Sequence, residues 1–172
     1  MNSIFIANLG KYNEGEMVGD WFELGQDREI LNKFLENVVG IHDEYDDYLI
    51  TDTDITEFTL AIDEYDNVYD INDSFIRYNE LSPEVKNMVQ AIIEAGYYDE
   101  TLEDAIERTI FYTLYTDLYE LGCAVVNLWY NDDPPYLGRL NDYLDYETIG
   151  REYLDENKGT ITSKGILIEE FE

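Results

Sequence analysis

The stretch from Phe34 to Ile76 constrains the fold more than any other, because it holds 13 Asp and Glu residues and neither Lys nor Arg. Apolar residues are threaded through the acids, as in the segment IHDEYDDYLITDTDITEF at residues 41–58. An acidic tail that stays disordered combines high charge with low hydrophobicity, and only the charge is found here. The stretch therefore predicts a folded region whose surface carries many carboxylates.

The whole chain shares this imbalance, with 40 acidic against 10 basic residues and a formal net charge of -30 in 172 residues. With 45% hydrophobic residues it still has enough material for a core, in one domain or in two or three small lobes. Repulsion among like charges destabilises a compact state and disfavours binding to DNA, RNA or an anionic membrane. The charge instead favours a basic partner, which the negative field attracts.

Residues able to support catalysis or to hold a metal are scarce in this sequence. His42 and Cys123 are its one His and its one Cys, so neither a nucleophile–base pair nor a structural zinc site is expected. The acidic stretches at residues 52–56 and 70–74 lack the Gly that a calcium loop needs at its sixth position. We expect no cofactor, no metal and no enzymatic activity; an enzyme using paired carboxylates is the alternative.

Targeting and membrane-spanning segments are not recognised in the sequence. The N-terminal residues MNSIFIANLGKYNEGE lack the basic region of a signal peptide, and no stretch approaches about 18 apolar residues in length. A single Cys forms no disulfide within the chain, which fits a reducing compartment. We therefore expect a cytoplasmic protein.

The first part of the chain is expected to be a small α+β lobe. Runs rich in β-branched and aromatic residues predict strands at residues 4–9, 20–24, 48–52 and 58–62, with a Gly-rich loop between the first two. From Asp27 onward, apolar residues recur at helical spacing, and Gly40 follows where the helix would end. The predicted apolar face of this helix consists of Ile30, Leu31, Phe34, Leu35 and Val38.

Helix signals dominate farther along the chain. Ser82-Pro83-Glu84 is a typical helix start, and Thr101 with Asp104 resembles a capping box. Residues 109–116 fit either a strand or a continued helix, whereas residues 117–130 favour a helix. After a break at 131–135 we expect a short helix near 137–144, an amphipathic stretch to residue 154 and a hairpin at 160–171.

The number of carboxylates is large enough to compare with the phosphates of DNA. Duplex DNA carries one charge per about 1.7 Å of its axis, so roughly 15 charges, half of the net charge, correspond to about 25 Å of duplex. A row of carboxylates would release the same counterions as DNA on binding a basic cleft, and the affinity would fall with salt. Composition alone leaves other roles open, including the retention of water and ions by a halophilic protein.

Three segments resemble one known family in the same order along the chain. IANLGKYNEGEMVGDWF at residues 6–22 is similar to the N-terminal segment of the ArdA antirestriction proteins, and DEYDDYLITD at 43–52 to their next acidic segment. YLDYETIGREYL at 143–154, followed by GTITSKGILIEEF at 159–171, resembles their C-terminal block. The resemblance spans nearly the whole chain and is weak over residues 63–130.

The resemblance implies a fold and a function. ArdA-like proteins are elongated, curved DNA mimics of three small lobes, which dimerise through the C-terminal lobe and occupy the DNA groove of type I restriction-modification enzymes. They are carried by plasmids, transposons and phages. We accordingly expect an α+β fold with an N-terminal sheet-and-helix lobe at residues 1–62, a mainly helical lobe at 63–108 and a mixed lobe with the dimer contact at 109–172.

The expected site residues fall into two groups. The acids expected to imitate phosphates lie in the base-free stretch and are Asp43, Glu44, Asp46, Asp47, Asp52, Asp54, Glu57, Asp63, Glu64, Asp66, Asp70 and Asp73. The family's antirestriction motif corresponds to about residues 117–130, where the expected dimer contacts are Leu118, Val125, Val126, Trp129 and Tyr130, with plain core as the alternative. A CRISPR effector or a transcription regulator is the alternative target, and neither nucleic acid nor a membrane is expected as a partner.

Overall fold

The computed structural model describes residues 2–42, 46–129, 138–157 and 159–170, the side chains of 138–140 excepted. Helices and two small antiparallel sheets make up the chain, so the predicted α+β class is confirmed. Contacts between Cα atoms group the chain into two compact units, one formed by residues 1–86 and 99–106 and the other by 87–98 and 107–172. The division into three lobes stays a prediction.

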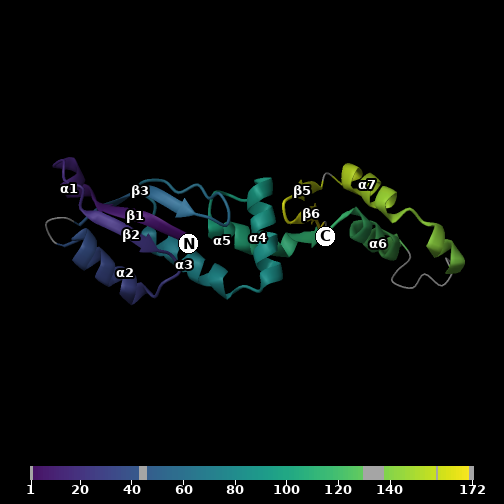
Figure 1. Ribbon diagram of the computed structural model, residues 1–172, viewed down its shortest axis with the longest axis horizontal. Helices are drawn as coiled ribbons and strands as arrows, with labels where there is room; N and C mark the ends of the chain where they lie inside the picture. Colours follow the sequence, from purple (N-terminus) through teal and green to yellow (C-terminus); the bar gives the residue numbers. More distant parts are fainter. Residues whose placement is uncertain (1, 43–45, 130–137, 158, 171–172) are drawn as a thin grey trace. The chain divides into compact units, whose positions relative to one another are not determined.

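The first unit is built on a three-stranded antiparallel sheet in the order β2-β1-β3 (Figure 1). Its strands are β1 (Asn2–Asn8), β2 (Gly19–Glu23) and β3 (Tyr48–Ile55), which confirm the first three predicted strands. Phe5 in the central strand pairs with Trp21 on one side and Asp52 on the other. Ile6 pairs with Ile50, so the register against β3 shifts by one residue at this point.

A short helix, α1 (Leu9–Asn13), follows β1 where the sequence predicted only a loop. The Asn8 side chain explains the difference, because its Oδ1 accepts a hydrogen bond from the Lys11 backbone N–H at 2.9 Å and caps the helix. The Asn8 amide group also donates to the carbonyls of Val39 and Gly40. One buried side chain therefore starts this helix and holds the end of the next one.

The predicted helix after Asp27 is present as α2 (Arg28–Phe34), which continues as a π-helical turn, η1 (Leu35–Val39). Gly40 ends it in the left-handed region with φ 74°, as the sequence predicted. The buried residues are Leu31, Leu35 and Val39, four apart, whereas Ile30 and Val38 of the predicted face are exposed. The buried face is therefore narrower than the predicted one, since only positions four residues apart are buried.

Residues 58–62, predicted as a strand, form neither helix nor strand. Phe58 instead packs its ring against two aromatic side chains of α3 (Val68–Glu80), at centroid distances of 6.0 Å from Phe75 and 5.3 Å from Tyr78. Residues 58–62 belong to an irregular segment that spans residues 56–67. This segment also contacts β3, where the Ile50 backbone N–H donates to the Glu64 carbonyl at 2.8 Å. Contacts with α3 and β3 therefore replace strand pairing for this segment.

Two further helices begin where the sequence predicted. The helix α4 (Pro83–Ala95) starts after Ser82, whose Oγ accepts from the Val85 backbone N–H, and it ends before Gly96 at φ 72°. The helix α5 (Leu102–Glu107) starts after Thr101, whose Oγ1 accepts from the Asp104 N–H at 3.1 Å. The chain passes between the two units within α4, after residue 86, again after residue 98, and within α5 after residue 106.

The second unit combines a sheet in the order β4-β6-β5 with two helices. Its elements are η2, a 3-10 helix (Arg108–Phe111), β4 (Tyr112–Tyr115), α6 (Leu118–Trp129), η3, a 3-10 helix (Gly138–Tyr143), α7 (Tyr146–Glu156), β5 (Thr160–Thr162) and β6 (Gly165–Glu169). The alternatives for residues 109–116 resolve into a short 3-10 helix followed by a strand. The predicted helix at 117–130 and the closing hairpin are confirmed.

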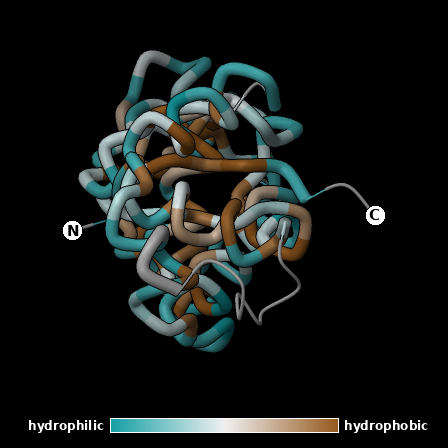
Figure 2. Tube along the Cα trace, turned by 90° about the vertical axis from the view of Figure 1, so that its right-hand side faces the viewer, coloured by the Kyte–Doolittle hydropathy of each residue, from teal (hydrophilic) through white to brown (hydrophobic). Residues whose placement is uncertain are grey.

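Two glycines let α6 and α7 approach closely. A Cβ atom on Gly122 would lie 1.9 Å from the Tyr146 carbonyl oxygen, and one on Gly150 would lie 2.1 Å from that of Leu118. The core beneath them consists of Leu121, Val125, Leu154, Ile166 and Ile168. Figure 2 shows hydrophobic stretches alternating with hydrophilic ones along the chain, which gives each unit apolar side chains for a core.

Candidate functional site

The predicted phosphate-like acids that the structure describes all lie in the first unit. Asp43 and Glu44 lie outside the described residues. Asp46 and Asp47 precede β3, Asp52 and Asp54 lie on it, Glu57, Asp63, Glu64 and Asp66 follow in the irregular segment, and Asp70 and Asp73 lie on α3. All of these are exposed except Asp66 and Asp73, which are half-buried. The structure thus places most of the predicted carboxylates in solvent.

The side chains of Asp52 and Asp54 lie on the same face of β3, because side chains two apart along a strand point the same way. Across the sheet Asp54 pairs with Ser3, and Ser3 pairs with Glu23 on the other side. Glu23 therefore adds an exposed acid to this face that our reasoning from the sequence missed. The sequence carried a signal for this position, because side chains alternate between the two faces of β2 and Glu23 therefore lies on the same face as Trp21.

The spacing of the carboxylates on β3 can be compared with the spacing of the phosphates on one strand of DNA. Two residues of β-strand rise by about 6.6 Å, so Asp52 and Asp54 supply one charge per that length. One strand of duplex DNA carries a charge per about 3.4 Å of axis. The row on β3 alone is therefore half as dense, and the acids before and after the strand are needed to reach the density of DNA.

Among the described residues of the first unit, four basic side chains form ion pairs with carboxylates, and Lys86 donates to the Asn79 carbonyl instead. Arg28 pairs with Asp73, its Nε lying 3.0 Å from Asp73 Oδ2, and this contact raises the pKa of the Arg28 guanidinium. Arg77 pairs with Glu103. Lys33 pairs with Glu29 at 2.7 Å and Lys11 with Glu14 at 2.8 Å. Of the predicted acids, Asp73 is thus neutralised by an ion pair.

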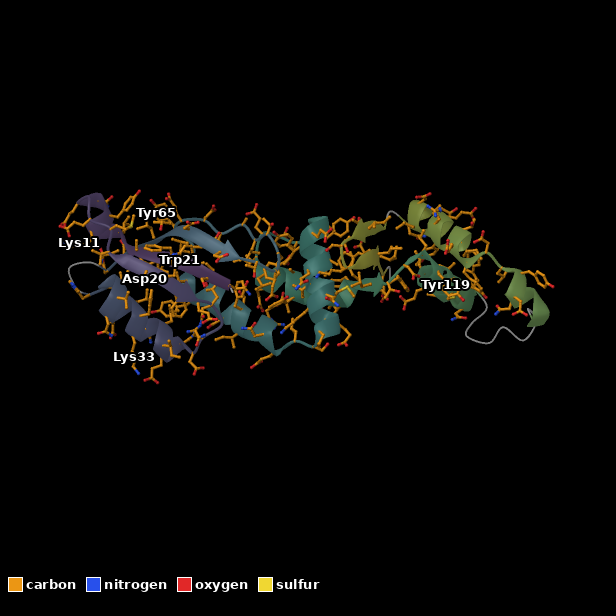
Figure 3. The ribbon with its side chains drawn as sticks, viewed as in Figure 1. Lys11, Asp20, Trp21, Lys33, Tyr65 and Tyr119 are labelled. Atoms are coloured by element: carbon orange, nitrogen blue, oxygen red, sulfur yellow. The ribbon has the colours of Figure 1, made fainter. Side chains whose placement is uncertain are left out.

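Several of the other acids have no ion-pair partner among the described residues, although the charge of Asp70 also raises the pKa of the Arg28 guanidinium. Within the part of the chain that the structure describes, no salt bridge joins a basic side chain to Asp46, Asp47, Asp52, Asp54, Asp63, Glu64 or Asp70. The Glu64 carboxylate raises the pKa of the neighbouring Tyr65 hydroxyl, as expected next to a negative charge. In Figure 3 Tyr65 lies beside β3, and Lys33 projects outward from α2. These acids form a negative surface along β3 and the segment after it.

Two of the predicted acids have structural partners instead. Glu57 accepts hydrogen bonds from the Tyr78 hydroxyl at 2.8 Å and from the Asn2 amide at 3.3 Å. Asp66 accepts from the Asp63 backbone N–H at 2.9 Å and closes a turn. Their carboxylates help to hold the irregular segment in place, and both oxygens of Glu57 accept a hydrogen bond.

The expected dimer contacts lie on α6 in the second unit, at different depths. Val125 and Val126 are both 2% exposed, and Val125 belongs to the core of the unit. Leu118 packs against that core and is half-buried. Trp129 is 60% exposed at the end of the helix, and Tyr130 lies outside the described residues. Of the described four, Trp129 is therefore the one most available to a partner.

Leu128 was missed by our reasoning from the sequence, although it is 65% exposed beside Trp129. Helical spacing gave no signal of this exposure, because Leu128 follows Leu121 by seven residues and Val125 by three, on the side of α6 that is buried one turn earlier. Leu128 lies in the last turn of α6, beyond the last buried residue of the helix. An exposed Leu next to an exposed Trp makes an apolar surface at the end of α6.

The described residues show neither a metal-binding cluster nor a membrane-spanning helix. Among the described residues, no group of three or more His, Cys, Asp or Glu side chains is arranged to hold a metal ion. Over the same residues, no helix has the length and apolar character needed to span a bilayer. Cys123 is a free, half-buried thiol, and His42 is exposed.

Comparison with known proteins identifies the family. A family model described as antirestriction protein (ArdA) matches residues 4–167, nearly all of the 172 residues. The comparison with curated protein sequences found no match. Proteins of the matched family are inhibitors of restriction, directed at restriction-modification enzymes. The match confirms the resemblance seen in the sequence, and this chain therefore belongs to the ArdA antirestriction family.

Proposed function

We propose that this chain inhibits type I restriction-modification enzymes, without catalysis, by occupying their DNA-binding groove as an acidic mimic of duplex DNA. The observation that carries the proposal is the set of exposed acids along β3 and the following segment, among which Asp52, Asp54 and Asp63 have no basic partner in the described part of the chain. Membership of an antirestriction family supports the target class.

Electrostatics explains how such a surface would work. A groove that binds DNA presents Arg and Lys to phosphates, and a surface of carboxylates releases counterions from itself and from the groove on binding. Each exposed charge pair contributes little, on the order of 0–1 kcal/mol, so that affinity must come from many pairs together. The net charge of -30 supplies them and also speeds the encounter with a positively charged cleft.

Dimerisation through the second unit is part of the proposal. Exposed apolar side chains at the end of α6, Leu128 and Trp129, would bury against the same surface of a second copy. Joining two acidic surfaces would extend the length of groove that one inhibitor covers. The resemblance of the C-terminal block to that of ArdA-like proteins supports this arrangement.

Competition with DNA tests the proposal. Purified type I restriction-modification enzyme is incubated with the protein, and binding is measured against increasing concentrations of duplex DNA that carries no recognition site, at several salt concentrations. We expect the duplex to displace the protein and the affinity to fall steeply with salt. Simultaneous binding of both ligands to the same enzyme, or an affinity that does not depend on salt, would contradict DNA mimicry.

A further inference from the structure

The first unit contains a cavity of about 240 Å³ whose wall has two kinds of side chain. Ile62, Ile71 and Leu102 contribute apolar surface, whereas Asp66, Asp70 and Glu100 contribute carboxylates. At about 30 Å³ for each water molecule, the volume corresponds to about eight waters and is below the range of sites for drug-sized ligands. The cavity therefore has room for one long side chain.

The polar groups of the wall are mainly acceptors. Asp70 and Glu100 are exposed carboxylates that have no ion pair within the described residues. Ser74 also lines the cavity; its hydroxyl donates to the Ile71 carbonyl at 2.8 Å, which leaves the Ser74 oxygen free to accept. The nearby cations are already engaged, since Arg28 pairs with Asp73 and Arg77 with Glu103.

A wall of apolar side chains and carboxylates favours an amphipathic cation as the ligand of this cavity. An anion would be repelled, and a purely apolar group would desolvate the carboxylates without pairing them. A long basic side chain covers apolar surface with its methylene stem while its charged head stays at a polar rim. Between the two candidates, a guanidinium fits better than an ammonium because it is less strongly hydrated and donates to two carboxylates from fixed directions.

We propose that this cavity receives an arginine side chain from the DNA-binding groove of the inhibited enzyme. The inference rests on the proposed function for the source of the arginine, because grooves that bind DNA are rich in Arg. It adds a defined recognition point to that function. The methylene stem of the arginine is buried there, and its guanidinium pairs with carboxylates. The phosphates of DNA are not flanked by an apolar cavity of this kind. Burial of the arginine stem is therefore a contact that the inhibitor makes and DNA does not.

A titration of the isotope-labelled full chain with N-acetyl-arginine N-methylamide tests the cavity itself. We expect saturable NMR shifts of the Ile62, Ile71 and Leu102 amides. The double variant Asp70→Asn, Glu100→Gln should weaken this binding by about five-fold, since two exposed charge pairs are lost. The matched variant Asp52→Asn, Asp54→Asn removes the same charge outside the cavity and should leave the dissociation constant unchanged.

Three outcomes would overturn the inference. They are equal binding of the uncharged norleucine analogue, shifts spread over β3 as strongly as over the cavity, and a double variant that binds like the parent protein. Because the titration contains no restriction enzyme, its failure would leave the displacement by DNA untouched. Conversely, if the cavity binds the arginine probe but duplex DNA does not displace the protein from the enzyme, the proposed function and the source of the arginine are refuted, whereas the cavity's preference for arginine stands.

Discussion

The two units of this chain use their surfaces in different ways. In the first, exposed acids such as Asp52 and Asp54 have no cationic partner in the described part of the chain. In the second, several acids hold the fold: Glu94 accepts from the backbone N–H and hydroxyl of Ser163, which lowers the pKa of its carboxyl, and Asp145 caps α7.

Both units expose apolar side chains, among them Trp21 and Val38 in the first. In the second unit Leu128 and Trp129 are exposed next to each other at the end of one helix. On the proposed function, carboxylates without partners serve recognition, whereas carboxylates that meet hydrogen-bond donors hold the fold. This difference also suggests a division of labour, with the first unit contacting the basic target and the second joining two copies.

The largest effect is expected from Gly122→Ala, which tests whether close helix packing holds the second unit together. The added methyl would meet the Tyr146 carbonyl oxygen at 1.9 Å, so α6 and α7 must separate. We expect a loss of about 2–3 kcal/mol in the free energy of unfolding, measured by urea denaturation. Asn127→Ala, at an exposed position of the same helix, is the control and should change stability little. An unaltered urea midpoint for Gly122→Ala would refute the packing argument.

The next largest effect concerns the acids of the first unit. Changing Asp46, Asp47, Asp52 and Asp54 together to Asn should weaken inhibition of the restriction enzyme by about 30-fold, or about 2 kcal/mol, since four exposed charge pairs are lost. The matched variant replaces four exposed acids of α7 by their amides, Glu147, Glu152, Asp155 and Glu156. Equal losses in cleavage-inhibition assays of the two variants would remove the proposed difference between the units.

A smaller effect is expected in the second unit when its apolar surface is made polar. The double change Leu128→Ser, Trp129→Ser should raise the dissociation constant of the dimer by about tenfold, because both side chains are exposed and would be buried by a second copy. Sedimentation velocity over a concentration series measures this constant. The matched double change Ile110→Ser, Phe111→Ser alters another exposed apolar pair of the unit and should leave dimerisation intact.

The smallest effect is expected from a single acid. Asp52→Asn should weaken inhibition by no more than about five-fold, because one exposed pair is worth on the order of 0–1 kcal/mol. Asp155→Asn on α7 provides the comparison from the other unit. Complete loss of inhibition by correctly folded Asp52→Asn would show that recognition depends on one localised site rather than on a distributed surface.

Local sequence signals predicted many elements correctly. Gly40 and Gly96 end helices at positive φ, and Ser82 precedes a helix that begins with Pro83, as expected from the backbone preferences of these residues. Such signals work because they act over a few neighbouring residues. The resemblance to the ArdA family likewise needed only short segments, and the family match confirms it.

Errors arose where a distant partner decided the local structure. The residues around Phe58 have the composition of a strand, yet residues 58–62 form no β-pairing. Phe58 instead packs on Phe75 and Tyr78 of α3. In the helix after Asp27, Ile30 and Val38 are exposed and Val39 is buried instead. Neither outcome is encoded in the spacing of apolar residues within the segment itself.

The sequence by itself determined the net charge and the stretch without bases, because charge adds up regardless of fold. Tertiary structure alone decided which acids stay unpaired: Arg28 neutralises Asp73 across a separation of 45 residues, whereas Asp52 and Asp54 have no such partner within the described chain. It also decided that Val125 and Val126 lie inside while Leu128 and Trp129 lie outside. Pairing and burial are contacts between residues far apart in sequence, and they come into existence only when the chain has folded.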